Sequence, residues 1–141
     1  MTMFKHILVP LDGSEQAERA LAYARELVQA TGARLTLLTV ILRFQHSLPR
    51  IEHLEETSRR LALDYLEPVA EKLPAGVRCD LRVIFGEPAE AITTLARDEN
   101  VDLIVMSTHG TGATGRDALG SVALKVLRTA PCPVTMVRIG A

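Results

Sequence analysis

The fold is decided by residues 6–15, HILVPLDGSE, where a short apolar run is followed at once by a turn. The run Ile7-Leu8-Val9 is typical of a strand, and it ends at Pro10 and the turn-forming sequence Asp12-Gly13-Ser14. Ser14 is a favourable N-cap for a helix. Beyond it, apolar residues recur at intervals of three and four until Thr31-Gly32 stops the pattern: Ala17, Ala20, Leu21, Ala24, Leu27 and Val28. The segment therefore predicts a strand, a loop and a helix in that order.

The same alternation continues to the end of the chain. Four more strands are predicted, at Leu35–Val40, Cys79–Phe85, Leu103–Met106 and Val134–Ile139. Helices are predicted between them, over Glu52–Leu73, after Pro88 and from Val122 to Ala130, and we expect Pro68 to kink or break the first of these. Five strands alternating with four helices predict right-handed crossovers and a mostly parallel sheet between two helical layers. Ligands bind such sheets beyond the carboxyl ends of the strands, where the strand order reverses.

Length and composition predict one α/β domain over residues 1–141. A formal net charge of -1 argues against nucleic acid as a partner, because phosphate neutralisation needs clustered Lys and Arg. Cys79 and Cys132 have no metal-binding or disulfide-framework spacing, and the four histidines are scattered, so no metal site is predicted. No apolar run is long enough for a membrane span. A cytoplasmic protein without a membrane partner is expected.

The glycine-rich stretch GTGATG, residues 110–115, spells G-x-G-x-x-G directly after a strand. A dinucleotide-binding fingerprint would also need an acidic residue about 20 positions later, but residues 118–141 contain no Asp or Glu. The spacing from Gly115 to Gly120 suits a P-loop, but no lysine follows Gly120. What both motifs share remains: the N-terminus of a helix at Gly120-Ser121, which attracts phosphate.

Three blocks of the sequence resemble the universal stress protein family. Its nucleotide-binding members carry G-x2-G-x9-G-[ST] before the last helix, and Ser107-Thr108-His109-Gly110, nine residues and Gly120-Ser121 reproduce that spacing. The opening HILVPLDGSE and the closing GSVALKVLRTAPCPVTMV also resemble the family, so the likeness spans nearly the whole chain. The resemblance implies a three-layer α/β/α sandwich with strand order 3-2-1-4-5.

The resemblance also implies a site for ATP or AMP, with or without Mg²⁺. Asp12 would contact the ribose or base, with Pro10 and Val40 lining the adenine pocket. Gly110, Gly120, Ser121 and the N–H of Val122 would bind the phosphates, and Arg116 could reach the β or γ phosphate. His109 lacks a partner at diagnostic spacing, so no catalytic residue is predicted and any ATP hydrolysis should be slow.

One departure from the family pattern keeps a second function open. Ser107 stands where the family has its first glycine, and a Cβ there resists positive φ and close backbone approach. The alternative is therefore a family member that binds no nucleotide and acts as a dimeric interaction module. In either case the last strand, which no helix follows, invites pairing with a second copy, and the resemblance implies a homodimer formed there.

Overall fold

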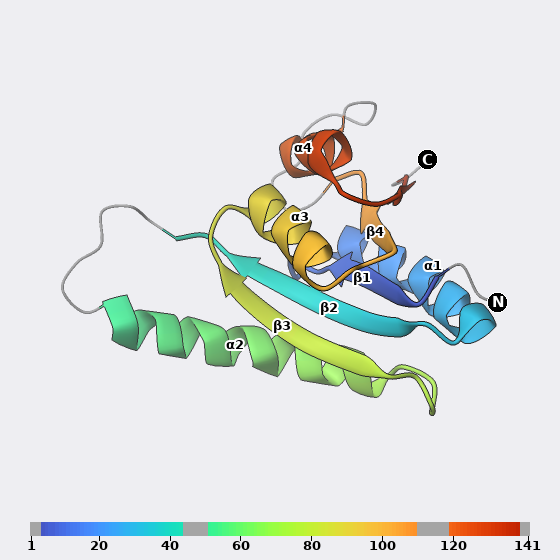
Figure 1. The fold of residues 1–141 in the computed structure, drawn as a ribbon. Helices are drawn as coiled ribbons and strands as arrows, with labels where there is room; N and C mark the ends of the chain where they lie inside the picture. Colours follow the sequence, from blue (N-terminus) through green and yellow to red (C-terminus); the bar gives the residue numbers. More distant parts are fainter. Residues whose placement is uncertain (1–3, 44–50, 110–118, 139–141) are drawn as a thin grey trace.

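The computed structural model describes residues 4–43, 51–109 and 119–138, in which strands and helices alternate (Figure 1). Their order and bounds are β1 (His6–Pro10), α1 (Glu15–Thr31), β2 (Arg34–Ile41), α2 (Ile51–Glu71), β3 (Cys79–Phe85), α3 (Pro88–Asp98), β4 (Leu103–Ser107), α4 (Ser121–Thr129) and β5 (Val134–Val137). These match the predicted elements within a few residues. The predicted end of the last strand, Ile139, lies outside the described residues.

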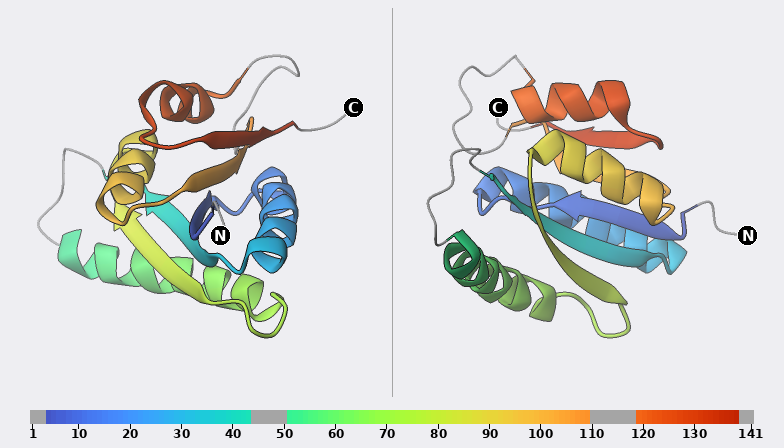
Figure 2. Two further views of the ribbon diagram at one scale, coloured as in Figure 1. Left: turned by 45° about the vertical axis from the view of Figure 1, so that its right-hand side comes forward. Right: turned by 60° about the vertical axis from the view of Figure 1, so that its left-hand side comes forward.

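All four strand pairs are parallel, and the strand order is β3-β2-β1-β4-β5, as the resemblance implied. Helices α1 and α2 cover one face of the sheet, and α3 and α4 cover the other (Figure 2). The chain runs outward from β1 to β2 and β3, then returns to place β4 on the other side of β1. The order therefore reverses between β1 and β4, and β5 is left as an edge strand.

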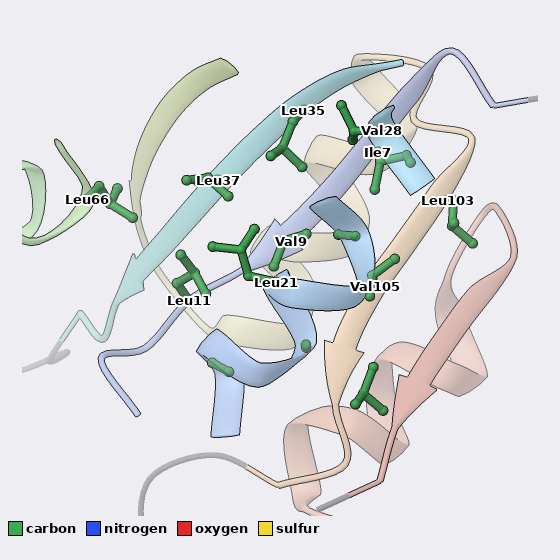
Figure 3. Packing of buried hydrophobic residues seen from close by; sticks show 14 of the residues in the cluster. Ile7, Val9, Leu11, Leu21, Val28, Leu35, Leu37, Leu66, Leu103 and Val105 are labelled. Carbon is green, nitrogen blue, oxygen red and sulfur yellow. The ribbon is translucent and has the colours of Figure 1, made fainter. Parts of the chain in front are cut away.

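The core has two parts, one on each face of the sheet. Figure 3 shows the larger one, in which Val9 and Leu37 from the strands pack with Leu21 of α1 and Leu66 of α2. Leu8 and Ile104 point to the other face and pack against α3 and α4. Burial on both faces explains why the central strands read as continuous apolar runs and not as alternating ones.

The helix boundaries follow the chemistry of their ends, with one difference from the sequence prediction. Ser14 Oγ accepts the Ala17 N–H at 3.2 Å, and the Gly32 N–H closes the other end of α1 on the Val28 carbonyl at 2.8 Å. The sequence predicts that Pro68 kinks or breaks the second helix, and the structure shows no break, because α2 continues past it to Glu71. Pro68 lies on the exposed side, so water can satisfy the carbonyl group that the missing N–H would have bonded. Within the described segments, no helix is both long and apolar enough to cross a membrane.

A buried histidine forms hydrogen bonds between neighbouring segments at the amino ends of the strands. His6 is 4% exposed, and its Nε2 lies 2.7 Å from Thr36 Oγ1 on β2. Its Nδ1 lies 3.2 Å from the Glu99 carbonyl oxygen and 3.0 Å from the Arg34 guanidinium. Burial is the main cause that lowers the pKa of His6 below its usual 6.5, and the charge of Arg34 lowers it further. The carbonyl and carboxylate of Glu99 and the carboxylate of Asp80 act in the opposite direction, but they do not outweigh the burial.

The lowered pKa of His6 predicts a loss of stability in mild acid. The native state binds fewer protons here than the unfolded chain, so this contribution is complete above pH 6.5 and is lost as the pH falls toward the native pKa. Urea unfolding at pH 7.5, 6.5 and 5.5 should show a smaller decrease in unfolding free energy for His6→Gln than for the parent. Parallel decreases in the two proteins would show that His6 does not cause the effect.

A candidate ligand-binding cleft

The cleft of interest opens where β1 and β4 separate. The Cα partners between these strands are Ile7 with Leu103 and Leu8 with Ile104, whereas β1 stays paired with β2 as far as Pro10 and Leu38. At the carboxyl edge, where β1 and β4 no longer pair, lies a cleft of about 740 Å³. This volume falls within the roughly 300–1,000 Å³ of typical small-molecule sites. Its position is the switch point of the sheet, as the fold class predicts.

Seven of the nine residues proposed from the sequence line this cleft: Pro10, Asp12, Val40, Ser107, Gly120, Ser121 and Val122. They come from the ends of three strands and the start of α4. The other two, Gly110 and Arg116, lie outside the described residues. The sequence alone does not assign the rest of the lining to the site: Leu11, Ala17, Leu38, Thr39, Leu42, Pro88, Ile92, Met106, Thr108, His109, Leu119 and Ala123.

Only some of the missed residues had a signal in the sequence. Thr108 and His109 fall inside the family spacing between Ser107 and Gly110, so the motif itself marked them. Pro88 and Ile92 belong to α3, which approaches the cleft from the α4 side of the sheet. The packing of α3 against its neighbours places these two residues at the cleft, and no local sequence pattern predicts that position.

The turn after β1 is fixed by side chains that bond to backbone. Asp12 Oδ1 accepts the Ser14 N–H at 3.0 Å, and Thr39 Oγ1 donates to the Leu11 carbonyl oxygen at 2.9 Å. Asp12 remains exposed at the edge of the cleft while Leu11 is buried beneath it. The sequence D-G-S therefore builds a rigid turn and also presents a carboxylate at the cleft.

The segment after β4 is held by successive hydrogen bonds. Ser107 Oγ donates to the His109 carbonyl oxygen, the Thr108 N–H donates to the Val137 carbonyl oxygen at 3.0 Å, and the Gly120 N–H donates to the Thr108 carbonyl oxygen at 2.8 Å. Among the described residues, positive φ at a non-glycine position occurs only at Asn100, so Ser107 keeps an ordinary backbone conformation. Of the two obstacles expected from a Cβ at Ser107, the need for positive φ is therefore absent, because serine readily adopts this backbone conformation, and its hydroxyl bonds back onto the chain.

His109 is a buried polar side chain of the cleft lining whose hydrogen bonding is incomplete among the described residues. It is 9% exposed, and its Nδ1 lies 3.0 Å from Thr108 Oγ1. Its Nε2 is buried and has no hydrogen-bond partner among the described residues. A buried polar atom without a partner costs free energy unless something outside the described chain satisfies it.

The start of α4 differs from the other two helices that begin at this edge and whose first turns are described. Ser14 and the acidic residues Glu15 and Glu18 occupy the first turn of α1, and Glu87 bonds the Ala89 and Glu90 N–H groups of α3. Helix α4 begins after Gly120, with no side-chain cap and no acidic residue in its first turn. Its leading N–H groups and partial positive charge are therefore open to an anion.

The described lining contains neither Lys nor Arg, so the groups in it that could attract an anion are N–H donors, chiefly those of the backbone at the start of α4. Elsewhere in the described residues, no group of three His, Cys, Asp or Glu side chains could hold a metal ion. The cleft thus combines an apolar side, a carboxylate at the β1 turn and an anion-attracting helix start. Together they define an open α/β protein with a small-molecule-sized cleft at the switch point of its sheet.

The chain belongs to the universal stress protein family, whose model matches residues 3–138. It is 42% identical over 137 residues to a universal stress protein of Thermus aquaticus, described as lying in the 3′ region of a QAH/OAS sulfhydrylase, covering 96% of this chain and all of that one. Among solved structures it resembles the universal stress protein UspA from Lactobacillus plantarum, with a TM-score of 0.85 and 27% identity over 96% of this chain and 98% of that one.

Two other solved family members share the fold at lower identity. A universal stress protein in complex with cAMP has a TM-score of 0.77 and 22% identity over 99% of this chain and 100% of that one. The universal stress protein from Archaeoglobus fulgidus in complex with dAMP has a TM-score of 0.67 and 21% identity over 97% of this chain and 100% of that one.

Proposed function

We propose that this protein binds an adenine nucleotide, ATP or AMP, in the cleft between β1 and β4 and serves as a nucleotide-responsive stress or signalling protein. The observation that carries the proposal is the convergence of seven sequence-predicted residues, from distant parts of the chain, on one cleft that ends at the uncapped start of α4. The family contains adenine nucleotide complexes, with cAMP and with dAMP. At 22% and 21% identity those structures support the fold alone, and this chain's own cleft residues support the nucleotide site.

The cleft divides into regions that suit the parts of a nucleotide. Pro10 and Val40 offer apolar surface for the adenine ring. Asp12 lies nearby and would accept hydrogen bonds from ribose hydroxyls, since an ionised carboxylate is an acceptor only. The backbone N–H groups at Ser121 and Val122, with the Ser121 hydroxyl, would bind the phosphate at the start of α4. If the ligand is ATP, Mg²⁺ would accompany the phosphates and neutralise part of their charge.

The alternative function, a family member without nucleotide, loses part of its support. That hypothesis depended on Ser107, and one of its two arguments, the need for positive φ, does not hold for the backbone after β4; the binding experiment below decides between the two functions. We assign no catalytic residue, and we expect any ATP hydrolysis to be slow. His109, the one basic side chain in the described lining, has no carboxylate hydrogen-bonded to it among the described residues.

Two further parts of the proposal concern assembly and compartment. Strand β5 is an edge strand, with Thr135 exposed and Val134 and Met136 half-buried, and such an edge is suited to pairing with β5 of a second copy. We therefore propose a homodimer through this edge. The thiols Cys79 and Cys132 are free, which suits the reducing cytoplasm as the compartment.

The direct test is to look for nucleotide and then to titrate it. Purified protein is denatured, the supernatant is analysed for adenine nucleotides, and nucleotide-free protein is titrated with AMP and ATP by calorimetry. We expect saturable binding of at least one of them at micromolar to submillimolar concentration. No nucleotide in the extract and no heat at millimolar AMP or ATP would refute the proposed function.

A further inference from the structure

The side-chain donors of the cleft are almost all used within the protein. Thr39 donates to Leu11, and Ser107 donates to His109. The polar side-chain groups of the described lining for which no partner within the chain is found are the Ser121 hydroxyl and His109 Nε2. Ser121 is exposed and can be satisfied by water, but His109 is nine-tenths buried. His109 is therefore the donor or acceptor most in need of a partner from a ligand.

The surroundings of the ring determine which role Nε2 takes. Thr108 is buried, and among the described residues its hydroxyl contacts Nδ1 of His109, a pair in which either atom can donate. When Thr108 Oγ1 donates to Nδ1, the single proton of the neutral imidazole lies on Nε2. Nε2 is then a donor and needs an acceptor.

A phosphate oxygen of a bound ligand would supply that acceptor. A Cβ placed on Gly120 would lie 3.6 Å from the His109 Cα, so the backbone of His109 lies beside the start of α4, and His109 is among the residues that line the cleft. The uncapped first turn of α4 attracts an anion to the same end of the cleft. The carboxylate of the lining, Asp12, belongs to the β1 turn and already accepts the Ser14 N–H.

We propose that His109 recognises phosphate in this cleft. Its Nε2–H, oriented by Thr108, donates to a phosphate oxygen of the bound nucleotide. The contact therefore distinguishes nucleotides from nucleosides. This inference rests on the proposed function and adds a specificity-determining residue to it. Three hydrogen bonds hold the backbone of residues 107–109 and a fourth, from Thr108 Oγ1, holds the ring, which limits the entropy lost on binding.

The test compares AMP with adenosine in two variants of similar side-chain size. His109→Leu removes the donor, and His109→Gln keeps an N–H donor near the Nε2 position. For AMP, the leucine variant should bind about tenfold to a hundredfold more weakly than the parent, because a charge-assisted hydrogen bond is lost. The glutamine variant should recover part of that loss. Adenosine, measured at millimolar concentration, should bind all three proteins with similar affinity.

The outcomes separate the two proposals. If the parent binds neither AMP nor ATP, the proposed function fails. If the parent binds AMP and the leucine variant binds it equally well, then His109 does not recognise the phosphate. The same conclusion follows if the leucine variant loses as much affinity for adenosine as for AMP. A long-range ¹H–¹⁵N spectrum of the imidazole in the free parent protein needs no variant, and it should show the proton on Nε2; a proton on Nδ1 alone would overturn the assignment.

Discussion

Replacing Gly120 with valine should strongly weaken nucleotide binding while leaving the fold intact. A Cβ on Gly120 would lie 3.2 Å from the Thr108 carbonyl oxygen, so even alanine forces a small shift between α4 and the segment after β4. Valine adds two methyl groups where the phosphate would meet the first N–H groups of α4. Hydrogen bonds to a charged group contribute about 1.5–3 kcal/mol each, so losing two of them should weaken AMP binding at least about a hundredfold.

The fold should survive because the backbone at Gly120, with φ −63° and ψ 159°, is one that valine adopts readily. We expect a loss of about 1 kcal/mol in stability from the poorer N-cap. Gly76→Val is the matched control, since it is the same substitution at a position where φ is +92° and no cleft residue is near. It should lower stability and retain AMP affinity. Calorimetry that gives Gly120→Val an AMP affinity within about threefold of the parent would place the phosphate elsewhere.

The largest effect on stability is expected from Leu66→Ala in α2. Leu66 is fully buried and packs in the core shared by the sheet, α1 and α2 (Figure 3). Truncating a buried leucine removes its transfer free energy and leaves a cavity, at a cost of roughly 2–5 kcal/mol. Urea unfolding should therefore show a markedly lower midpoint with an unchanged slope.

Leu61→Ala is the control on the same helix. Leu61 is 64% exposed, and the change in helix propensity is the same as at Leu66. Its effect should stay within about 0.5 kcal/mol. Equal losses at Leu61 and Leu66 would mean that α2 does not dock on the sheet through the face described.

The sequence predicts most of the fold because its signals are local. A continuous apolar run such as Leu35–Val40 indicates a strand buried on both faces, and Ser14, Gly32 and Pro88 mark helix ends through their own backbone chemistry. Pro68 shows the limit of such rules, because its effect depends on which side of the helix it occupies. The strand order came from the family resemblance, since strand alternation alone leaves several orders possible.

The candidate-site residues that belong to a sequence motif could be predicted, whereas the features of the site that depend on packing could not. Spacing identified Ser107, Gly120 and Ser121, but the consequence of serine at 107 required the backbone conformation and the hydrogen bond to His109. The burial of His109 and the missing hydrogen-bond partner of its Nε2 depend on the folded structure, because Thr108 and the approach of Gly120 determine them. A lone histidine in a sequence has no pattern that would reveal them.

The most direct measurement of the central claim is an amide NMR titration of the nucleotide-free protein with AMP and, separately, with adenosine. The N–H signals of Ser121 and Val122, at the start of α4, should shift strongly and saturably with AMP and much less with adenosine. Signals at the Asp12 turn and Val40 should respond to both ligands. AMP shifts that leave the first turn of α4 unaffected, or that cluster away from the edge between β1 and β4, would contradict a nucleotide site in this cleft.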